Sequence, residues 1–196
     1  MNKEKELIDK LIDLAFAEDI GDGDHTTLSC IPATAMGKSK LLIKEAGVLA
    51  GIEVAKEIFN RFDPSMKVEV FINDGTEVKP GDVAMIVEGK VQSLLQTERL
   101  MLNVMQRMSG IATMTRKYAR QLEGTHTRVL DTRKTTPGMR ILEKMAVKIG
   151  GGVNHRIGLF DMILLKDNHV DFAGGIDKAI NRAKDYCKEK GKDLKI

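Results

Sequence analysis

Cationic side chains gather in three short segments of the C-terminal half, and their chemical types suit an anionic ligand. Asp131–Gly138 and Lys166–Gly174 are polar stretches that each follow an apolar run, and Gly150–Arg156 lies between them. Arginine binds carboxylate or phosphate groups bidentately, whereas lysine acts as a compact point charge. The pattern therefore predicts a site for a small, multiply charged anion, formed by Arg133, Lys134, His155, Arg156 and Lys166.

The apolar pattern around these segments predicts parallel α/β structure that would bring them together. From residue 127 onward, short apolar runs alternate with helical periodicity. In parallel α/β folds, ligands bind in loops at the C-terminal ends of the strands, so we expect the cations there. A solvated basic surface is the alternative interpretation. The expected elements are a strand at 128–131, a helix at 139–149, a strand at 161–165, a loop at 166–174, a helix at 176–190 and the start of a strand at 193–196.

The N-terminal half has a different rhythm, which predicts a separate region of mixed α and β structure. Apolar spacing predicts helices at 3–17 and 52–62, and the rest of residues 37–90 is typical of strands and turns. An apolar stripe almost free of helix breakers predicts one long helix over 91–122. The acidic run 18–27 lacks the spacing of a calcium loop, so we expect a turn capped by local Asp and Thr side chains.

Composition excludes several classes of protein. The 196 residues are 42% hydrophobic and 30% charged, which is typical of a globular chain rather than a disordered one. No apolar run approaches the length of a membrane span, and the N-terminus lacks the apolar centre of a signal peptide. The two cysteines lack the spacing of metal ligands and fit reduced thiols, so we expect a cytoplasmic protein with no membrane partner.

Charge is unevenly distributed along the chain. Acidic residues outnumber basic ones in residues 1–90 and the reverse holds in residues 91–196, although the whole chain carries 31 basic and 28 acidic side chains. A basic half could bind nucleic acid, but this one lacks the interleaved aromatic residues that stack on bases. A small anionic substrate fits the basic half just as well, and we expect no nucleic-acid partner.

Several stretches agree with the sequence of one enzyme family. They are Asp131–Thr135, Gly151–Arg156, Leu165–His169, Glu98–Arg99 and Ser109–Thr113, with further agreement at Glu18–Thr27, Ala46–Gly51 and Gly75–Gly81. They resemble the type II phosphoribosyltransferases, and among these the quinolinate phosphoribosyltransferases. The resemblance implies an α+β N-terminal sandwich domain over residues 1–112, with a long connecting helix that starts near residue 91. For residues 113–196 it implies the first part of an α/β domain, an incomplete TIM-like barrel cut off near the third barrel strand.

The resemblance also implies a reaction. Members of the family are glycosyltransferases of the pentosyltransferase type, also called carboxylating nicotinate-nucleotide pyrophosphorylases. They transfer the phosphoribosyl group of phosphoribosyl pyrophosphate to quinolinate with decarboxylation. The products are nicotinate mononucleotide, pyrophosphate and CO2, in a step of de novo NAD biosynthesis. Mg²⁺ is expected together with phosphoribosyl pyrophosphate, and no metal ligands are expected within this chain.

The motifs carry roles over to individual residues. By resemblance, Arg133, His155 and Arg156 line the quinolinate pocket. Lys134 and Lys166 are the expected catalytic residues, and they also bind substrate, because they lie toward the reacting groups and the phosphates. Positive charge held in place would then position two anions that repel each other, without covalent catalysis.

Two further expectations concern the limits of the site. Thr132 joins the substrate-binding set through its motif. In the family, the arginine that matches Arg99 enters the active site of the neighbouring subunit, so a homodimer is implied. Family members continue with acidic residues and glycine-rich phosphate loops that would lie beyond Ile196. We therefore expect a truncated chain that is inactive on its own.

Two alternatives to this function stay open. One is the homologous pyrophosphorylase-like protein associated with molybdenum transport, although Arg133–Lys134 and His155–Arg156 favour the dicarboxylate enzyme. The other is a biotinyl or lipoyl carrier module, because Gly75–Asp82 resembles the first hairpin of such a carrier. No lysine follows at the tip of a second hairpin within a carrier-like span, which argues against the carrier.

Overall fold

The computed structural model describes residues 3–196, which divide into two compact units. The first unit contains the chain up to Asp131 together with Thr135–Asn154. The second contains Thr132–Lys134 together with His155–Ile196. Helices and strands both occur, as the sequence predicts, so the chain is of mixed α and β structure.

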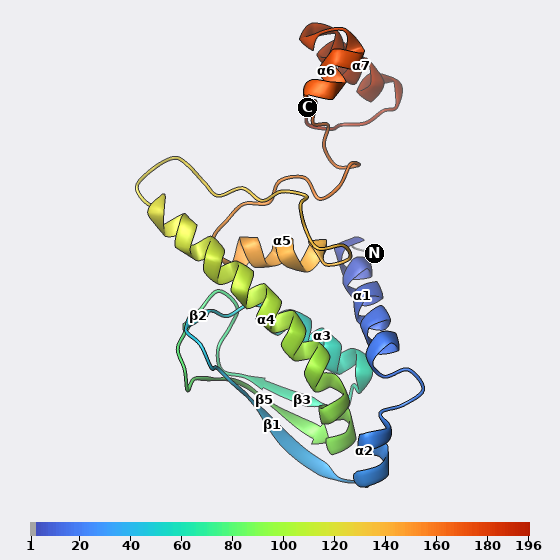
Figure 1. Ribbon diagram of the computed structural model, residues 1–196, viewed down its shortest axis with the longest axis vertical. Coiled ribbons are helices and arrows are strands. Elements are labelled where there is room, and N and C mark those ends of the chain that lie inside the picture. The colour runs from blue at the N-terminus through green and yellow to red at the C-terminus, as the bar shows by residue number, and fades with distance from the viewer. Residues whose placement is uncertain (1–2) are drawn as a thin grey trace. The chain divides into compact units, whose positions relative to one another are not determined.

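An antiparallel sheet forms the base of the first unit (Figure 1). Its strand order is β1 (Met36–Leu42), β5 (Val83–Lys90) and β3 (Lys67–Val70). The register pairs Met36 with Lys90 and shifts between Leu41 and Leu42. A second, two-stranded sheet pairs β2 (Gly47–Val48) with β4 (Glu77–Val78).

Two helices cover one face of the three-stranded sheet (Figure 1). They are α3 (Ile52–Phe62) and α4 (Val91–Gln121), which confirms both helices predicted from apolar spacing. The backbone of Gly51 before α3 has φ +108°, and a Cβ there would come within 3.2 Å of Met105 and Met108. Glycine is therefore required where α3 meets α4. The buried face of α4 repeats every three or four residues, at Thr97, Leu100, Met101, Val104, Met105, Met108 and Ala112.

The N-terminal helix α1 (Lys3–Asp19) is also confirmed, and ion pairs join it to α3. Arg61 contacts Asp13 at 2.5 Å, and Lys5 contacts Glu57 at 2.9 Å. After α1 the expected capped turn is present, because the Asp24 carboxylate accepts a hydrogen bond from the Thr27 amide (3.0 Å). That cap begins a short helix, α2 (His25–Cys30), which the sequence pattern did not predict.

The C-terminal part of the first unit is built on α5 (Arg140–Ile149), as predicted, which packs against α4. The strand expected at 128–131 is not formed, and one isolated parallel bridge between Leu130 and Val153 stands in its place. After α5 the backbone passes close to α4: a Cβ on Gly150 would lie 2.5 Å from the carbonyl oxygen of Ala112. Close packing therefore requires glycine at position 150, the first of three consecutive glycines (residues 150–152).

The second unit corrects the sequence-based expectation. Residues 166–174, expected to be a loop, contain helix α6 (Asp167–Ala173), which packs on the predicted helix α7 (Ile176–Glu189) (Figure 1). The segments 161–165 and 193–196, expected to be strands, form none. Ile163 does donate a hydrogen bond to the Lys195 carbonyl (2.9 Å), but one such bond makes no ladder. The expected β-α-β-α-β order is therefore not found.

No helix within residues 3–196 combines the length and apolarity that a membrane crossing requires. The barrel and the division at residues 112 and 113 remain predictions.

Candidate functional site

Two cationic segments that are distant in sequence, Thr132–Lys134 and the chain from His155 through Lys166, belong to the same compact unit. The second unit consists of Thr132–Lys134 and of the chain from His155 onward. It thus unites six of the seven expected site residues, namely Thr132, Arg133, Lys134, His155, Arg156 and Lys166.

The first segment is held in a turn by its own threonine. The Thr132 hydroxyl accepts a hydrogen bond from the Lys134 amide (3.1 Å), which fixes the backbone on both sides of Arg133. Thr132 and Lys134 are exposed, while Arg133 is half-buried. The turn therefore presents a lysine to solvent next to a partly enclosed arginine.

The second segment contains a buried arginine. Arg156 is only 8% exposed, and its guanidinium donates to the Met162 carbonyl (3.3 Å). The Asp161 carboxylate accepts from the amides of Ile157 and Gly158 at 2.7 and 2.8 Å, which turns the chain back toward Arg156. A merely solvated basic surface does not bury an arginine, so this observation counts against that alternative.

Lys166 stands immediately before α6. Its amide donates to Nδ1 of His169 (3.1 Å), which closes the first turn of the helix, and its side chain is exposed. His155, beside Arg156, is half-buried. Lys166 was expected in a loop, and in the structure it is the residue directly before the first turn of α6.

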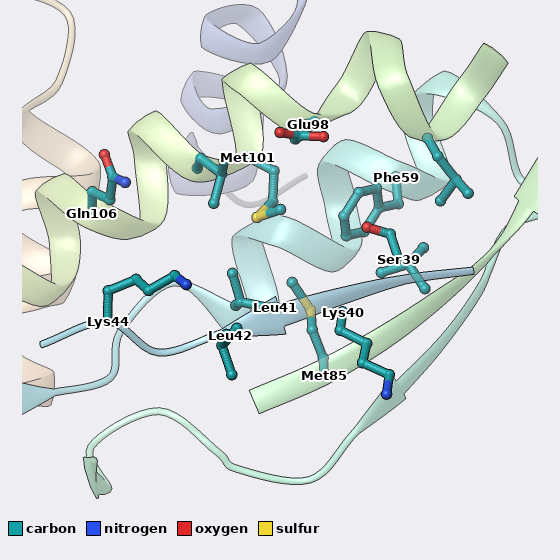
Figure 2. A pocket seen from close by; sticks show the side chains of 13 residues that line it. Ser39, Lys40, Leu41, Leu42, Lys44, Phe59, Met85, Glu98, Met101 and Gln106 are labelled. Atoms are coloured by element: carbon teal, nitrogen blue, oxygen red, sulfur yellow. The ribbon is translucent and has the colours of Figure 1, made fainter. Parts of the chain in front are cut away.

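Arg99 is the one expected site residue that lies in the first unit. It is exposed on α4, next to the buried Leu100. A cavity of about 320 Å³ lies between α4 and strand β1. Figure 2 shows side chains that line it, among them Glu98, Lys40 and Lys44. None of the seven expected site residues lines this cavity in the described part of the chain.

The loop that carries Arg133 is flanked by buried charges that sequence reasoning missed. Lys144 of α5 pairs with Asp131 at 2.5 Å, and their side chains are 1% and 5% exposed. Glu143 of α5 accepts from Arg107 at 2.7 and 3.0 Å. Burial raises the pKa of Glu143, but the hydrogen bonds and charge of Arg107 outweigh it, so this pKa lies below its ordinary value. The signal available in the sequence was the pair of adjacent charges between the apolar residues Leu142 and Met145 of α5.

A protein-bound metal ion requires a group of ligand side chains that lie close together. Among residues 3–196, no group of three or more His, Cys, Asp or Glu side chains is placed to hold one. The cations of the second unit instead suit anionic groups such as carboxylates and phosphates.

Comparison with known proteins gives two family matches that meet within α4. The model of the quinolinate phosphoribosyl transferase N-terminal domain matches residues 24–109, and that of the C-terminal domain matches residues 111–196. A mixed α/β chain with these two domains in order is of the phosphoribosyltransferase class. The chain belongs to the quinolinate phosphoribosyltransferase family.

Individual relatives agree with this assignment. The chain is 48% identical over 181 residues to "Quinolinate phosphoribosyltransferase [decarboxylating] 1b" of Nicotiana tabacum, covering 91% of this chain and 51% of that protein. It is 49% identical over 172 residues to the chloroplastic "Nicotinate-nucleotide pyrophosphorylase [carboxylating]" of Oryza sativa subsp. japonica, covering 87% of this chain and 46% of that one. The crystal structure of NadC from Streptococcus pyogenes matches with TM-score 0.87 and 42% identity, over 92% of this chain and 64% of that chain. The chain thus spans about half the length of the curated relatives it matches.

Proposed function

We propose that this chain supplies the quinolinate-binding part of an enzyme that transfers a phosphoribosyl group to quinolinate with loss of CO2. The observation that carries the proposal is the union of the two cationic segments in one compact unit of a chain from this family. Quinolinate is a dicarboxylate, and phosphoribosyl pyrophosphate carries a phosphate and a pyrophosphate. Arginine and lysine side chains are the groups best suited to both.

In the proposed site, the side chains divide between the two substrates. Arg133, His155 and Arg156 bind the carboxylates of quinolinate, and the partial burial of the arginines strengthens these contacts by excluding water. Lys134 and Lys166, which are exposed, would bind the phosphates and act on the reacting groups. Thr132 holds the turn that contains Arg133 through its hydrogen bond with the Lys134 amide.

The proposed chemistry follows from charge. As pyrophosphate leaves, positive charge builds on the ribose C1, and the pyridine nitrogen of quinolinate attacks that carbon. The pyridinium nitrogen then stabilises the carbanion left when the adjacent carboxylate departs as CO2. The protein contributes by positioning the two anions and by holding positive charge ready where they meet. Mg²⁺ arrives as part of the phosphoribosyl pyrophosphate substrate.

We further propose a homodimer in which Arg99 acts in the site of the partner subunit. The exposure of Arg99 on α4, and its place outside the unit that holds the other six residues, support this proposal. Cytoplasmic location also remains a proposal, because the names of several relatives place them in mitochondria or chloroplasts. The comparisons give no support to the molybdenum-associated protein or to the carrier module.

Titration of quinolinate into residues 1–196 by calorimetry tests the proposal. We expect saturable binding that is weaker for nicotinate, which lacks one carboxylate. Equal affinity for both ligands, or no binding of quinolinate, would overturn the assignment. The expected inactivity of residues 1–196 alone stays a prediction, and release of CO2 with phosphoribosyl pyrophosphate and Mg²⁺ measures it.

A further inference from the structure

Helix α5 buries two adjacent and oppositely charged residues. Glu143 is 7% and Lys144 1% exposed, beside the buried Leu142 and Ala146. Buried charges are costly unless they are paired, and an apolar pair would serve a purely structural helix face as well or better. The position of the partners therefore decides what these two residues do.

Lys144 reaches the start of the loop that carries Arg133. Its ammonium pairs with Asp131 (2.5 Å), the residue directly before Thr132. With its amide nitrogen turned toward these acceptors, Asn154 donates to the other oxygen of Asp131 and to the carbonyl of Lys144, both at 2.9 Å. The Asp131 amide also donates to the Val153 carbonyl (3.1 Å).

Glu143 reaches the end of the same loop. Its Oε1 accepts from the Arg107 guanidinium, and its Oε2 accepts from the amide of Thr136 (3.3 Å). The Arg107 guanidinium also donates to the Thr136 hydroxyl (3.1 Å). Arg140, one turn earlier on α5, donates to the hydroxyl of Thr135 (3.0 Å).

Together these contacts restrain the loop from both ends. Successive helix residues point about 100° apart, so neighbouring side chains of α5 diverge to two anchor points, Asp131 and Thr136. Four residues lie between the anchors, including Arg133 and Lys134. Asp131 and Asn154 are moreover the residues at which the chain leaves the first unit toward the two cationic segments.

We infer that Glu143 and Lys144 are positioning residues, which hold the loop of Arg133 in its binding geometry. Asn154, the residue directly before His155, bonds to both Asp131 and Lys144 and so links the second segment to the start of this loop. The inference rests on the proposed function for its ligand, but its contacts do not. A loop held at both ends binds more tightly, because less conformational entropy is lost when the ligand arrives.

The test separates positioning from support of the fold. Lys144→Met alone leaves the buried Asp131 carboxylate without this cation and should lower thermal stability. The double variant Lys144→Met/Asp131→Asn removes both charges, so its stability should return toward that of the wild type. We nevertheless expect its affinity for quinolinate to stay at least tenfold weaker, and Lys144→Arg to recover part of the affinity. Lys148→Met, which changes an exposed lysine of the same helix, is the matched control.

Hydrogen exchange provides a readout that needs no ligand. Amides of residues 132–136 should exchange at least tenfold faster in the double variant and in Glu143→Gln than in Lys148→Met. Unchanged exchange together with wild-type affinity in a stable double variant would overturn the positioning role. If the wild-type chain fails to bind quinolinate while loop exchange still rises in the variants, the proposed ligand is wrong and the positioning role stands.

Discussion

At the residue scale, short polar contacts fix the backbone beside several of the candidate binding side chains. Thr132 accepts from the Lys134 amide on one segment, and Asp161 accepts from two successive amides after Arg156 on the other. Such local bonds define the direction of a side chain without using the side chain itself. The backbone beside Lys134 and Arg156 is therefore ordered by bonds that do not involve the cationic groups themselves.

Replacing Arg133 by alanine should weaken quinolinate binding strongly. Loss of a charge-assisted, partly buried contact costs about 2–4 kcal/mol, which corresponds to roughly 30- to 1000-fold in affinity. Calorimetric titration measures the change. Arg128→Ala removes an exposed arginine a few residues earlier and should leave the affinity unaltered. If both variants bind like the wild type, Arg133 does not contact the ligand.

Acid should destabilise the protein in part through Glu143. The folded-state pKa of this carboxyl lies below its ordinary value of 4.5, so its ionised form stabilises the fold. That contribution is present above the ordinary pKa and is lost as the pH falls through the lower, folded-state pKa. Urea unfolding between about pH 6 and pH 3 should show a smaller loss of stability in Glu143→Gln than in the wild type. Parallel pH profiles of the two proteins would exclude this contribution.

At the scale of elements, close packing of α4 against the chain after α5 explains the glycines there. Gly150 has an ordinary backbone conformation, with φ −71°, so its need for glycine is purely steric. A Cβ would meet the backbone of Ala112 at 2.5 Å and Thr115 at 2.7 Å. Backbone atoms within a helix cannot yield easily, so the contact is a firm constraint.

Two glycine-to-alanine changes should therefore have opposite effects. Gly150→Ala should lower the free energy of unfolding by about 1–3 kcal/mol through overpacking. Gly110→Ala, within α4 where a Cβ meets nothing within 4 Å, should raise it by about 0.5–1 kcal/mol. The urea concentrations at the denaturation midpoints compare the two variants. Destabilisation by Gly110→Ala would show that a methyl group at position 110 does meet neighbouring atoms.

Helices were predictable from the sequence because their signal is local. The spacing at 91–122 gave α4 within one residue of its observed end, Gln121. The strands expected at 161–165 and 193–196 were wrong, because a strand depends on partners elsewhere in the chain. The short helix α6 was missed because its seven residues offer too few turns for periodicity.

The candidate site was predictable in part for a related reason. Residue types and spacing indicate which segments carry the cations, and the structure brings these residues into one compact unit. The roles of Glu143 and Lys144 could not be predicted from local sequence patterns. Lys144 pairs with a residue 13 positions away, and Glu143 pairs with one 36 positions away. Neither the burial of Arg156 nor its bond to Met162 carries a sequence signal.

At the scale of the whole molecule, the proposed shared site predicts complementation between two defective subunits. Arg99→Ala and Arg133→Ala chains each should bind quinolinate poorly. In a mixed dimer, one site would carry both lesions and the other neither, so each hybrid regains one intact site. Calorimetry after verified subunit exchange should recover binding with reduced stoichiometry. Failure to recover any binding would contradict a site built across two subunits.

Helix α4 also constrains how the two family domains can be recombined. The family matches end at residue 109 and resume at 111, inside a single helix of 31 residues that is about 46 Å long. Buried side chains lie on both sides of this boundary between the two family matches, at Met108 and Ala112. A chimaera that joins the N-terminal domain of one relative to the C-terminal domain of another must therefore keep the helical phase. One inserted residue would rotate everything beyond it by about 100° and turn Ala112 away from the glycine it packs against.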